Sequence, residues 1–544
     1  MVGFQRSGFG VFKASAVTLW ASAPAASPIG AVHLLLRKSS MRTNFLVRIE
    51  SAFLAIALCG LLVLGACGTR PLGSGGGIGS GSAAPFTLAI SSPFTIGTVN
   101  NVPSGITVIS FRIMITGAVL QPGNVSLISS PQTIELTQLQ TDNAIIGTTN
   151  VPTANYTSLD ITFANPDMTI YNGAGSVASC TVGTICEVQP ALAVSSVTLS
   201  PALTLTANTP AGVELELSVN DSLQPDLSFD PSQGLTFLDL PSVASSAILL
   251  PLNNVAGVIT NIGTNQFAIT TTNGLSLTIG TTSSTQYSFP STVCSANDFG
   301  CLANGQFIST DLNVLGSGSF QANDVIFEDS SGEPGILGTI AATNTTLNPP
   351  QFTLVIHGQA PATSGVFPDN VAIVSLQNPT TYLIDADDLP IPSGYTFAST
   401  SDLVVGQEVL VRANTINVTP VTNQPSIITI STDQLILRQS QWTANVGLAT
   451  TSGTGAFTLT SLPNLFTDIT PNAITNFYVV TSPETVFVNS TLTTLTPGTS
   501  ETVKGLIFSN IVNPVSSPSD VVSIVQGAPN FQPAIARRAK SRLR

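Results

Sequence analysis

Apolar and polar residues alternate along much of the chain beyond residue 84. Residues 159–163 and 213–219 carry an apolar side chain at every second position, with Asp, Thr, Glu or Ser between them. Strict alternation places the apolar side chains on one face of a strand and the polar ones on the other. Turn-forming residues separate such strands every ~8 to 12 residues. The pattern predicts a β-sandwich over residues 85–250.

From residue 251 onward the same order of features occurs three times. Each copy opens with a glycine in an apolar strand, continues to a phenylalanine, then to a Thr-containing segment with an aromatic residue, and then to a glycine before a closing strand. The order is kept while the spacers vary, as expected when loops of different length join fixed strands. The corresponding residues are Gly257, Gly338 and Gly447, then Phe267, Phe352 and Phe457, then Thr285, Thr381 and Thr485, then Gly305, Gly406 and Gly498.

The predicted fold is all-β: an N-terminal β-sandwich followed by three small β-barrel-like repeats. Each copy has about five or six strands, enough for a closed barrel, and closure removes exposed strand edges. The predicted segments are an extension (1–40), a lipoprotein signal peptide (41–66), a lipidated Cys with a Gly/Ser linker (67–84), the sandwich (85–250), the three repeats (251–332, 333–440 and 441–528) and a basic tail (529–544).

Composition supports this fold and reduces the classes of partner that the protein can bind. Hydrophobic residues make up 43% of the chain, but beyond residue 66 they form short runs, far from the ~18 to 20 apolar residues of a spanning helix. Val, Ile and Thr are frequent and favour strands. All but one of the 29 acidic residues follow Cys67, whereas residues 67–530 contain five basic ones. Such an acidic body disfavours nucleic-acid binding.

The N-terminal region is typical of a signal peptide. Residues 41–66 begin with Met41, carry Arg42 and Arg48, and continue into an apolar stretch over residues 53–64. A basic start, a short apolar region and small residues at its end are the features of an export signal. We therefore expect translation to start at Met41, and we exclude residues 1–40 from the fold.

The end of that signal, Leu64-Gly65-Ala66-Cys67, resembles the lipobox of bacterial lipoproteins. The resemblance implies that Cys67 becomes the first residue, carrying diacylglycerol and palmitate, and anchors the chain in the cell envelope. Gly68 in place of Asp is similar to lipoproteins of the outer membrane, on its periplasmic or surface face. The alternative is a plain secretory peptide that happens to contain a cysteine. Residues 68–84 form a flexible Gly/Ser linker.

Two family resemblances concern the body. Residues 133–163 and 213–223, with a Pro152-x-x-x-Tyr156 turn, resemble the bacterial domain-of-unknown-function family 4382. This resemblance implies a transthyretin-like or similar sandwich and no known activity. The three repeats resemble domain-of-unknown-function family 5666, and the middle copy, with residues 403–409, fits best. The first copy departs through a cysteine loop, and the third lacks acidic residues before its glycine.

Four cysteines remain in the body, in two local pairs. Export favours disulfides, and each pair encloses a short turn-like segment. We predict bridges Cys180–Cys186 and Cys294–Cys301, with free thiols as the alternative. Zinc is disfavoured because neither spacing is C-x-x-C and His357 is the one histidine after Cys67.

Candidate catalytic chemistry is sparse. No G-x-S-x-G, P-loop or H-E-x-x-H motif occurs in the sequence. We interpret His357 as a surface or strand-end histidine. Asp385, Asp387 and Asp388 form the densest acidic group, in a loop bounded by prolines. We interpret these carboxylates as groups that keep the loop solvated. The alternative is that two of them form the carboxylate pair of a glycoside hydrolase. Calcium is a further alternative, in this loop or at Asp221, Asp226 and Asp230.

Two classes of function remain open. The first is a non-catalytic envelope protein whose tandem β-modules bind or space something, with an envelope polysaccharide or protein as ligand. The second is a carboxylate-dependent, polysaccharide-active enzyme. One histidine, and the scarcity of the Trp and Tyr residues that stack on sugars, favour the first, so no catalytic residue, metal or cofactor is predicted. The tail, with Arg537, Arg538, Lys540, Arg542 and Arg544, either contacts anionic surfaces or solubilises the chain.

Overall fold

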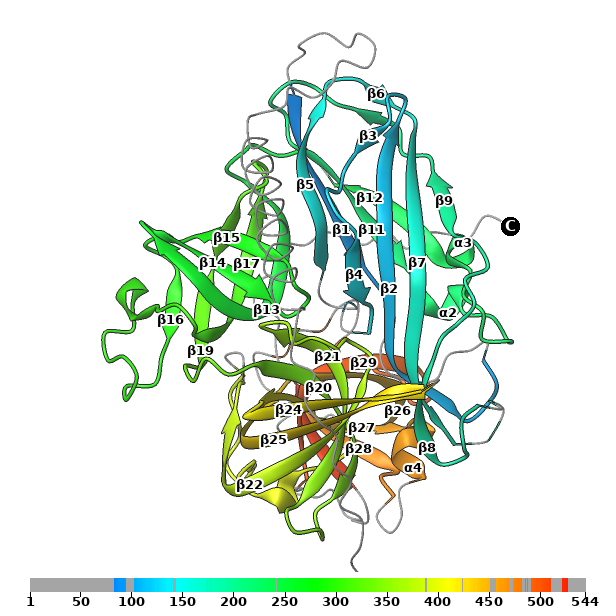
Figure 1. Cartoon of the computed structure of the whole chain (residues 1–544), viewed down its shortest axis with the longest axis vertical. Coiled ribbons are helices and arrows are strands. Elements are labelled where there is room, and N and C mark those ends of the chain that lie inside the picture. Colours follow the sequence, from blue (N-terminus) through cyan, green and yellow to red (C-terminus); the bar gives the residue numbers. More distant parts are fainter. Residues whose placement is uncertain are drawn as a thin grey trace, which may run out of the picture. The chain divides into compact units, whose positions relative to one another are not determined.

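A computed structural model gives the fold (Figure 1). It describes residues 83–526, apart from residues 94–101, 138, 140–142, 174, 176, 178, 241, 387–388, 423, 451–455, 469–472, 482–484, 486, 488–490 and 510–520, and it describes the backbone alone at 448–450 and 521–526. The predicted signal peptide, Cys67, the linker up to residue 82 and the basic tail lie outside these residues, whereas residues 83 and 84, which were predicted as linker, begin the first strand. Within the described part, no helix has both the length and the apolar character needed to cross a membrane.

The all-β prediction is confirmed. The described helices are three single turns, Val219–Ser222 (α2), Pro231–Gly234 (α3) and Asn464–Thr467 (α4), and two 3-10 turns, Phe299–Cys301 and Thr400–Asp402. Strands account for the rest of the regular structure, as β-branched composition and period-two alternation predict.

The first module, residues 83–240, is a sandwich of two sheets. One sheet has the order β12-β11-β1-β5, and the other has the order β3-β2-β7-β8, with β4 on β2 and β9 on β7. Alternating apolar residues of both sheets face each other, among them Phe86, Phe111 and Phe163. The strands are Ala83–Ser91 (β1), Ile106–Gln121 (β2), Val125–Ser126 (β3), Gln132–Glu135 (β4), Ala144–Pro152 (β5), Asn155–Tyr156 (β6), Ser158–Asn172 (β7), Thr184–Val188 (β8), Ser196–Leu199 (β9), Leu203–Thr204 (β10), Ala211–Leu217 (β11) and Leu235–Leu240 (β12).

Three further strand groups follow, which we call barrel 1 (248–329), barrel 2 (335–438) and barrel 3 (440–526). Barrel 1 contains Ile248–Gly263 (β13), Gln266–Thr271 (β14), Ser276–Gly280 (β15), Gln286–Ser288 (β16), Phe307–Leu315 (β17), Phe320–Ala322 (β18) and Asp324–Asp329 (β19). Barrel 2 contains Gly335–Asn344 (β20), Gln351–Ala360 (β21), Val371–Ile384 (β22), Glu408–Arg412 (β23), Thr415–Val421 (β24) and Gln424–Arg438 (β25). Barrel 3 contains Ser440–Thr450 (β26), Ala456–Thr460 (β27), Asn476–Val480 (β28), Ser500–Phe508 (β29) and Val521–Gln526 (β30).

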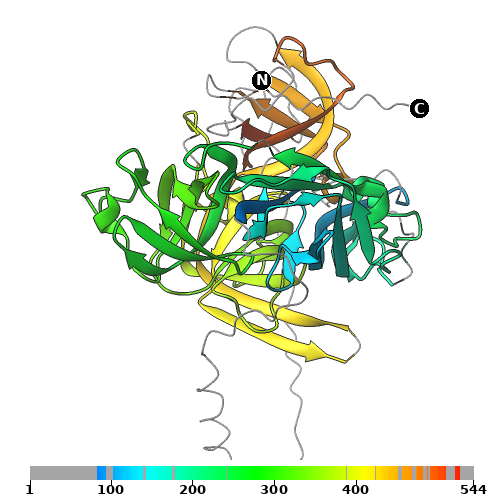
Figure 2. The same cartoon turned by 90° about the horizontal axis from the view of Figure 1, so that it is seen from above.

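The three barrels share one topology. Barrel 3 closes in the order β26-β27-β28-β30-β29, and barrel 2 follows the same path through β20-β21-β22-β25-β23. Barrel 1 matches them through β13-β14-β15-β18-β17. Along each of these paths the third strand runs parallel to the fourth, as β15 to β18, β22 to β25 and β28 to β30, while the other neighbours on the path are antiparallel. This is the strand order of the five-stranded Greek-key barrel of the OB type. In Figure 2 the β24–β25 hairpin of barrel 2, in yellow, projects beyond its neighbours.

The second set of repeated glycines forms the same turn in each barrel. Gly305, Gly406 and Gly498 have φ angles of 87°, 92° and 88°, a conformation that glycine adopts without strain. Each glycine donates its N–H to a carbonyl of the first strand, that of Ile259, Ile340 or Val446, at 2.7 to 2.8 Å. The next residue accepts a bond back from the same strand position. The repeat seen in the sequence is therefore a repeat of hydrogen bonds.

The first set of repeated glycines has a different role. Gly257, Gly338 and Gly447 lie inside the first strands, where the second strand crosses closely. A Cβ at Gly338 would lie 2.3 Å from the Val355 carbonyl oxygen. Gly257 and Gly338 permit close backbone approach, whereas at Gly447 a Cβ would lie 2.4 Å from the Thr458 hydroxyl oxygen.

Both predicted disulfides are present, Cys180–Cys186 and Cys294–Cys301. The first bridge links β8 to the loop before it. The second one lies in the loop between β16 and β17 of barrel 1.

Buried apolar clusters cross between the modules. Ala89 and Ile145 of the sandwich belong to the same buried cluster as the core of barrel 1. Ile109 of the sandwich belongs to a cluster with Trp442 and Phe477 of barrel 3. The modules are therefore packed against one another and are not beads on flexible linkers.

Candidate functional site

His357 lies within β21 and is buried, so its interpretation as a surface or strand-end histidine was wrong. Its side chain is 1% exposed and lies between two glutamates. Its Nδ1 is 3.6 Å from Glu135 of the sandwich, and its Nε2 is 3.8 Å from Glu408 of barrel 2. We call these three residues, with Thr137 and Thr339, the histidine cluster.

The hydrogen bonds of the two threonines indicate the charge of the imidazole. The Thr339 hydroxyl donates to Glu408 at 2.7 Å, and the Thr137 hydroxyl donates to Glu135 at 2.5 Å. A hydroxyl has one hydrogen, so both threonine oxygens can act only as acceptors towards His357. They lie 2.9 Å from Nε2 and 3.4 Å from Nδ1. These directions favour an imidazolium, with a hydrogen on each ring nitrogen of His357.

The raised pKa of His357 and the lowered pKa of Glu135 agree with this assignment. Burial alone would lower the pKa of His357, but Glu408 and Glu135 outweigh burial and raise it. Burial alone would raise the pKa of Glu135, but His357 and the bonds from Thr137 and Phe111 hold it below its usual range. Burial raises the pKa of Glu408 despite its neighbours. The cluster is an electrostatic contact between the sandwich and barrel 2 that depends on protonated His357.

We expect His357→Gln to lose more stability at pH 6 than at pH 9. Because the pKa of His357 is raised by folding, its contribution is complete below the unfolded value of 6.5 and disappears as the pH rises through the folded value. Gln retains hydrogen bonds but no charge, so the loss at pH 6 should be about 1.5 to 3 kcal/mol. Urea denaturation at both pH values measures it. An equal loss at the two values would show that the imidazole acts in its neutral form.

Asp385 is also buried, at the junction of barrels 1 and 2, so the prediction of a solvated loop was wrong for this residue. It lies 3.2 Å from Arg438, whose side chain is 2% exposed. Arg438 also lies 3.5 Å from Glu328 of barrel 1 and donates to Ser309 at 3.1 Å. One cation thus compensates two carboxylates that come from different barrels. Asp387 and Asp388 lie outside the described residues.

A third charged cluster joins β2 and β7 of the sandwich to the loop after β21. Arg112 contacts Asp167 at 2.8 Å and Asp369 at 2.7 Å. Glu187 accepts bonds from the Val371 N–H and the Asn370 amide of barrel 2. Three carboxylates thus surround one guanidinium. Burial, with Asp167 and Glu187 nearby, outweighs Arg112 and raises the pKa of Asp369 to about 8.

Two of the acidic residues considered for calcium, Asp226 and Asp230, serve local structure. The Asp230 side chain caps α3 and accepts two bonds from Ser232. Asp226 accepts two bonds from Ser228, which lower its pKa. Across the residues that the structure describes, no group of three His, Cys, Asp or Glu side chains is placed to hold a metal ion.

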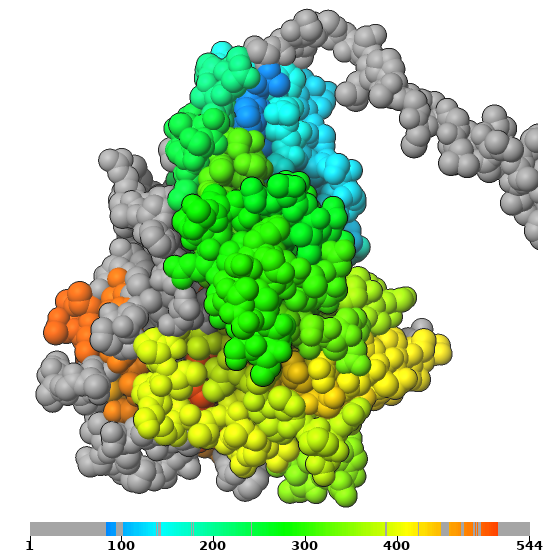
Figure 3. Space-filling view, turned by 90° about the vertical axis from the view of Figure 1, so that its left-hand side faces the viewer, coloured from blue at the N-terminus to red at the C-terminus, as the bar shows by residue number. Residues whose placement is uncertain are grey.

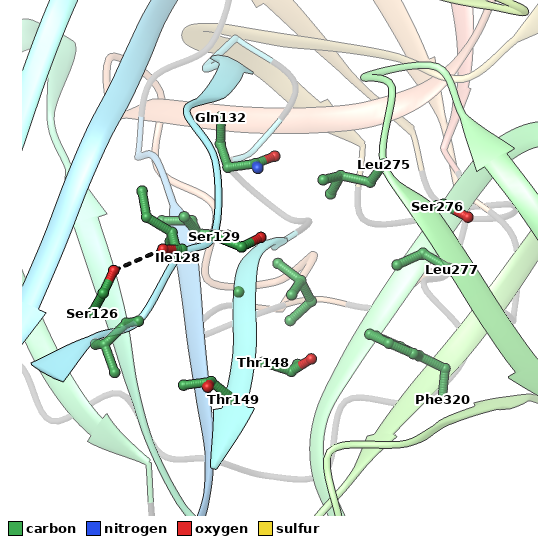
Figure 4. Close-up of a pocket in the computed structure, with 14 residues that line it drawn as sticks. Ser126, Ile128, Ser129, Gln132, Thr148, Thr149, Leu275, Ser276, Leu277 and Phe320 are labelled. Atoms are coloured by element: carbon green, nitrogen blue, oxygen red, sulfur yellow. Dashed lines mark hydrogen bonds between the residues drawn. The ribbon is translucent and has the colours of Figure 1, made fainter. Parts of the chain in front are cut away.

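One open site among the described residues is a trough of about 410 Å³ between the sandwich and barrel 1. Figure 3 shows barrel 1, in green, against the blue and cyan strands of the sandwich. The sandwich wall consists of β5 and the loop between β3 and β4, and the barrel wall consists of β15 and the start of β18. In Figure 4, Leu275, Leu277 and Phe320 extend from barrel 1 towards Thr148 and Ser129.

The trough has a neutral lining. It presents hydroxyl groups of serine and threonine, the amide of Gln132, and the apolar side chains of leucine, isoleucine and Phe320. Gly147 allows the loop to lie over β5, because a Cβ there would be 2.5 Å from the Leu127 carbonyl oxygen. Such a lining suits an uncharged ligand, held by hydrogen bonds and apolar contact.

Neither the trough nor the partners in the charged clusters were predicted from sequence. Arg112 is the single charged residue of β2, a strand otherwise rich in apolar residues, whereas β4 is short and mostly polar, and β23 and β25 each carry two charged residues. A lone charge in such a strand is a usable signal, since buried charges occur with partners. The partner itself belongs to another module and has no fixed spacing in the chain.

Compared with known proteins, the chain matches no protein-family model, no curated protein and no solved structure. The resemblances to families 4382 and 5666 stay predictions.

Proposed function

We propose that this chain is a lipoprotein of the cell envelope, anchored at Cys67 in the outer membrane, whose four β-modules form a non-catalytic binding protein. The ligand is an envelope protein or polysaccharide, and nucleic acid is disfavoured by the acidic body. The proposal combines the lipobox resemblance of residues 64–67 with the packed array of β-modules.

One observation carries the non-catalytic part. The histidine of the body, together with Glu135, Glu408 and Asp385, lies in buried contacts between modules. General acid–base catalysis needs such groups within hydrogen-bond reach of a substrate. Here their partners are other side chains of the protein, so the clusters fix how the modules pack. The open trough offers neutral groups, which suit binding.

One preparation tests both parts of the proposal. The protein is extracted from membranes, and mass spectrometry of its N-terminal peptide should show an acylated Cys67. The same sample, incubated with polysaccharide, peptide and ester substrates, should show no turnover above buffer. Turnover that disappears in a variant with Asp387→Asn and Asp388→Asn, with the fold intact, would establish the enzymatic alternative. An unmodified Cys67 would reject the anchor.

A further inference from the structure

Among the residues that the structure describes, part of the third strand of barrel 1, β15, has no partner on the side where the third strands of barrels 2 and 3 are paired. In barrel 1, Ile279 and Gly280 of β15 pair with β18. In barrel 3 all five residues of β28 pair with β30. In barrel 2, β22 pairs with β25 from Ala372 onward. Ser276 pairs with Thr270 as Val371 pairs with Val355, so Leu277 and Thr278 correspond to Ala372 and Ile373, the first residues of β22 that pair with β25.

This difference in pairing comes from the segment that precedes the partner of the third strand, which is β18 in barrel 1 and β25 in barrel 2. In barrel 2 that segment is the β24–β25 hairpin (Figure 2). Because of the hairpin, β25 begins at Gln424, four residues before Ile428, the first residue of β25 that pairs with β22. In barrel 1, β17 ends at Leu315 and β18 begins at Phe320, so a tight turn replaces the hairpin. Barrel 1 therefore lacks the residues that would cover the edge of β15 at 276–278.

This uncovered edge lies at the trough. Leu275, Ser276 and Leu277 form part of its wall. The opposite wall is β5, the last strand of its sheet, which pairs with β1 and with no other described strand. Strand edges present rows of N–H and C=O groups that add a further extended chain.

Resting on the proposed function, we propose that the trough binds an extended, uncharged peptide segment of a partner protein, which adds to β15 at residues 276–278 as a parallel strand. The occupant takes the place that the chain itself fills in barrels 2 and 3. A polysaccharide would not use a strand edge, and the trough offers it one aromatic ring, that of Phe320.

The covering segment of barrel 2 indicates the chemistry of the ligand. Residues 426–432 read Ser-Ile-Ile-Thr-Ile-Ser-Thr, without charge. Ile428 and Ile430 are buried, while Thr429 and Ser431, which alternate with them, are partly exposed. A ligand that alternates apolar and hydroxyl residues would place one face against Leu277 and the other against the hydroxyl groups of the trough.

The test uses a fluorescent peptide of residues 426–432 and the complete mature protein. We expect saturable binding by fluorescence anisotropy, together with slower amide exchange at residues 276–278. The peptide with N-methylated backbone at alternate residues should bind at least about tenfold more weakly, because it cannot complete the strand bonds. Equal binding of the N-methylated peptide would overturn strand addition.

A matched pair of variants locates the site. Thr148 and Asn150 are both exposed on β5, but Thr148 lines the trough and Asn150 does not. Thr148→Lys should weaken binding about tenfold or more, whereas Asn150→Lys should not. Equal effects of the two changes, or no binding to the wild type, would overturn this inference. The proposed function would stand in that case, because lipidation and turnover are measured separately.

Discussion

Arg438→Met should destabilise the protein by about 3 to 5 kcal/mol, the usual effect of removing one partner from a buried ion pair. Methionine fills much of the volume, but Glu328 and Asp385 would then lie buried without the cation that is 3.5 and 3.2 Å away. Urea denaturation of the mature protein measures the difference in unfolding free energy.

Arg412→Met is the matched control. Arg412 lies at the same junction and contacts Asp329, Glu333 and Asp433, but its side chain is 21% exposed, against 2% for Arg438. Partly exposed ion pairs contribute about 1 kcal/mol or less. A loss for Arg438→Met no larger than that of Arg412→Met would mean that burial does not decide the strength of this junction.

Asp369→Asn should stabilise the protein, and the gain should grow between pH 6 and pH 8. The pKa of Asp369 is raised to about 8 in the folded protein, whereas its ordinary value is 3.8. Between these values the folded state binds one more proton than the unfolded state, so wild-type stability falls as pH rises, by about 1.4 kcal/mol per pH unit for this group. Asparagine resembles the protonated carboxyl and does not titrate. The advantage should therefore grow by up to about 2.7 kcal/mol over these two pH units.

The substitution is compatible with the backbone. Asp369 has a φ of 76°, and asparagine tolerates this left-handed conformation as aspartate does. Urea denaturation at pH 6, 7 and 8 gives the comparison. An advantage that stays constant over this range would show that Asp369 is ionised throughout and that Arg112 alone compensates it.

Together with His357→Gln, Asp369→Asn tests whether protonation stabilises the contact between the sandwich and barrel 2. His357 and Asp369 both belong to barrel 2, and both face carboxylates or cations of the sandwich. Each binds a proton more tightly in the folded state, so each should weaken the contact as the pH rises. The sandwich–barrel 2 junction is thus expected to be firmer at pH 6 than at pH 8.

The sequence by itself determined the strands, the three repeats and both disulfides. These features are local or periodic: alternation specifies a half-buried strand, Gly305, Gly406 and Gly498 specify the same turn, and each cysteine pair is six or seven residues apart. Such features can be recognised in the sequence because the interacting groups are close together in the chain or recur at regular positions.

Only the tertiary structure decided the junctions and the trough. Glu135 meets His357 across 222 positions of the sequence, and Arg438 meets Asn254 across 184. No periodicity links such residues, so His357 and Asp385 were assigned to solvent although they are buried. The open edge at residues 276–278 likewise depends on a hairpin that barrel 2 has and barrel 1 lacks. Packing between modules is set by three-dimensional complementarity, which alternation along a strand does not encode.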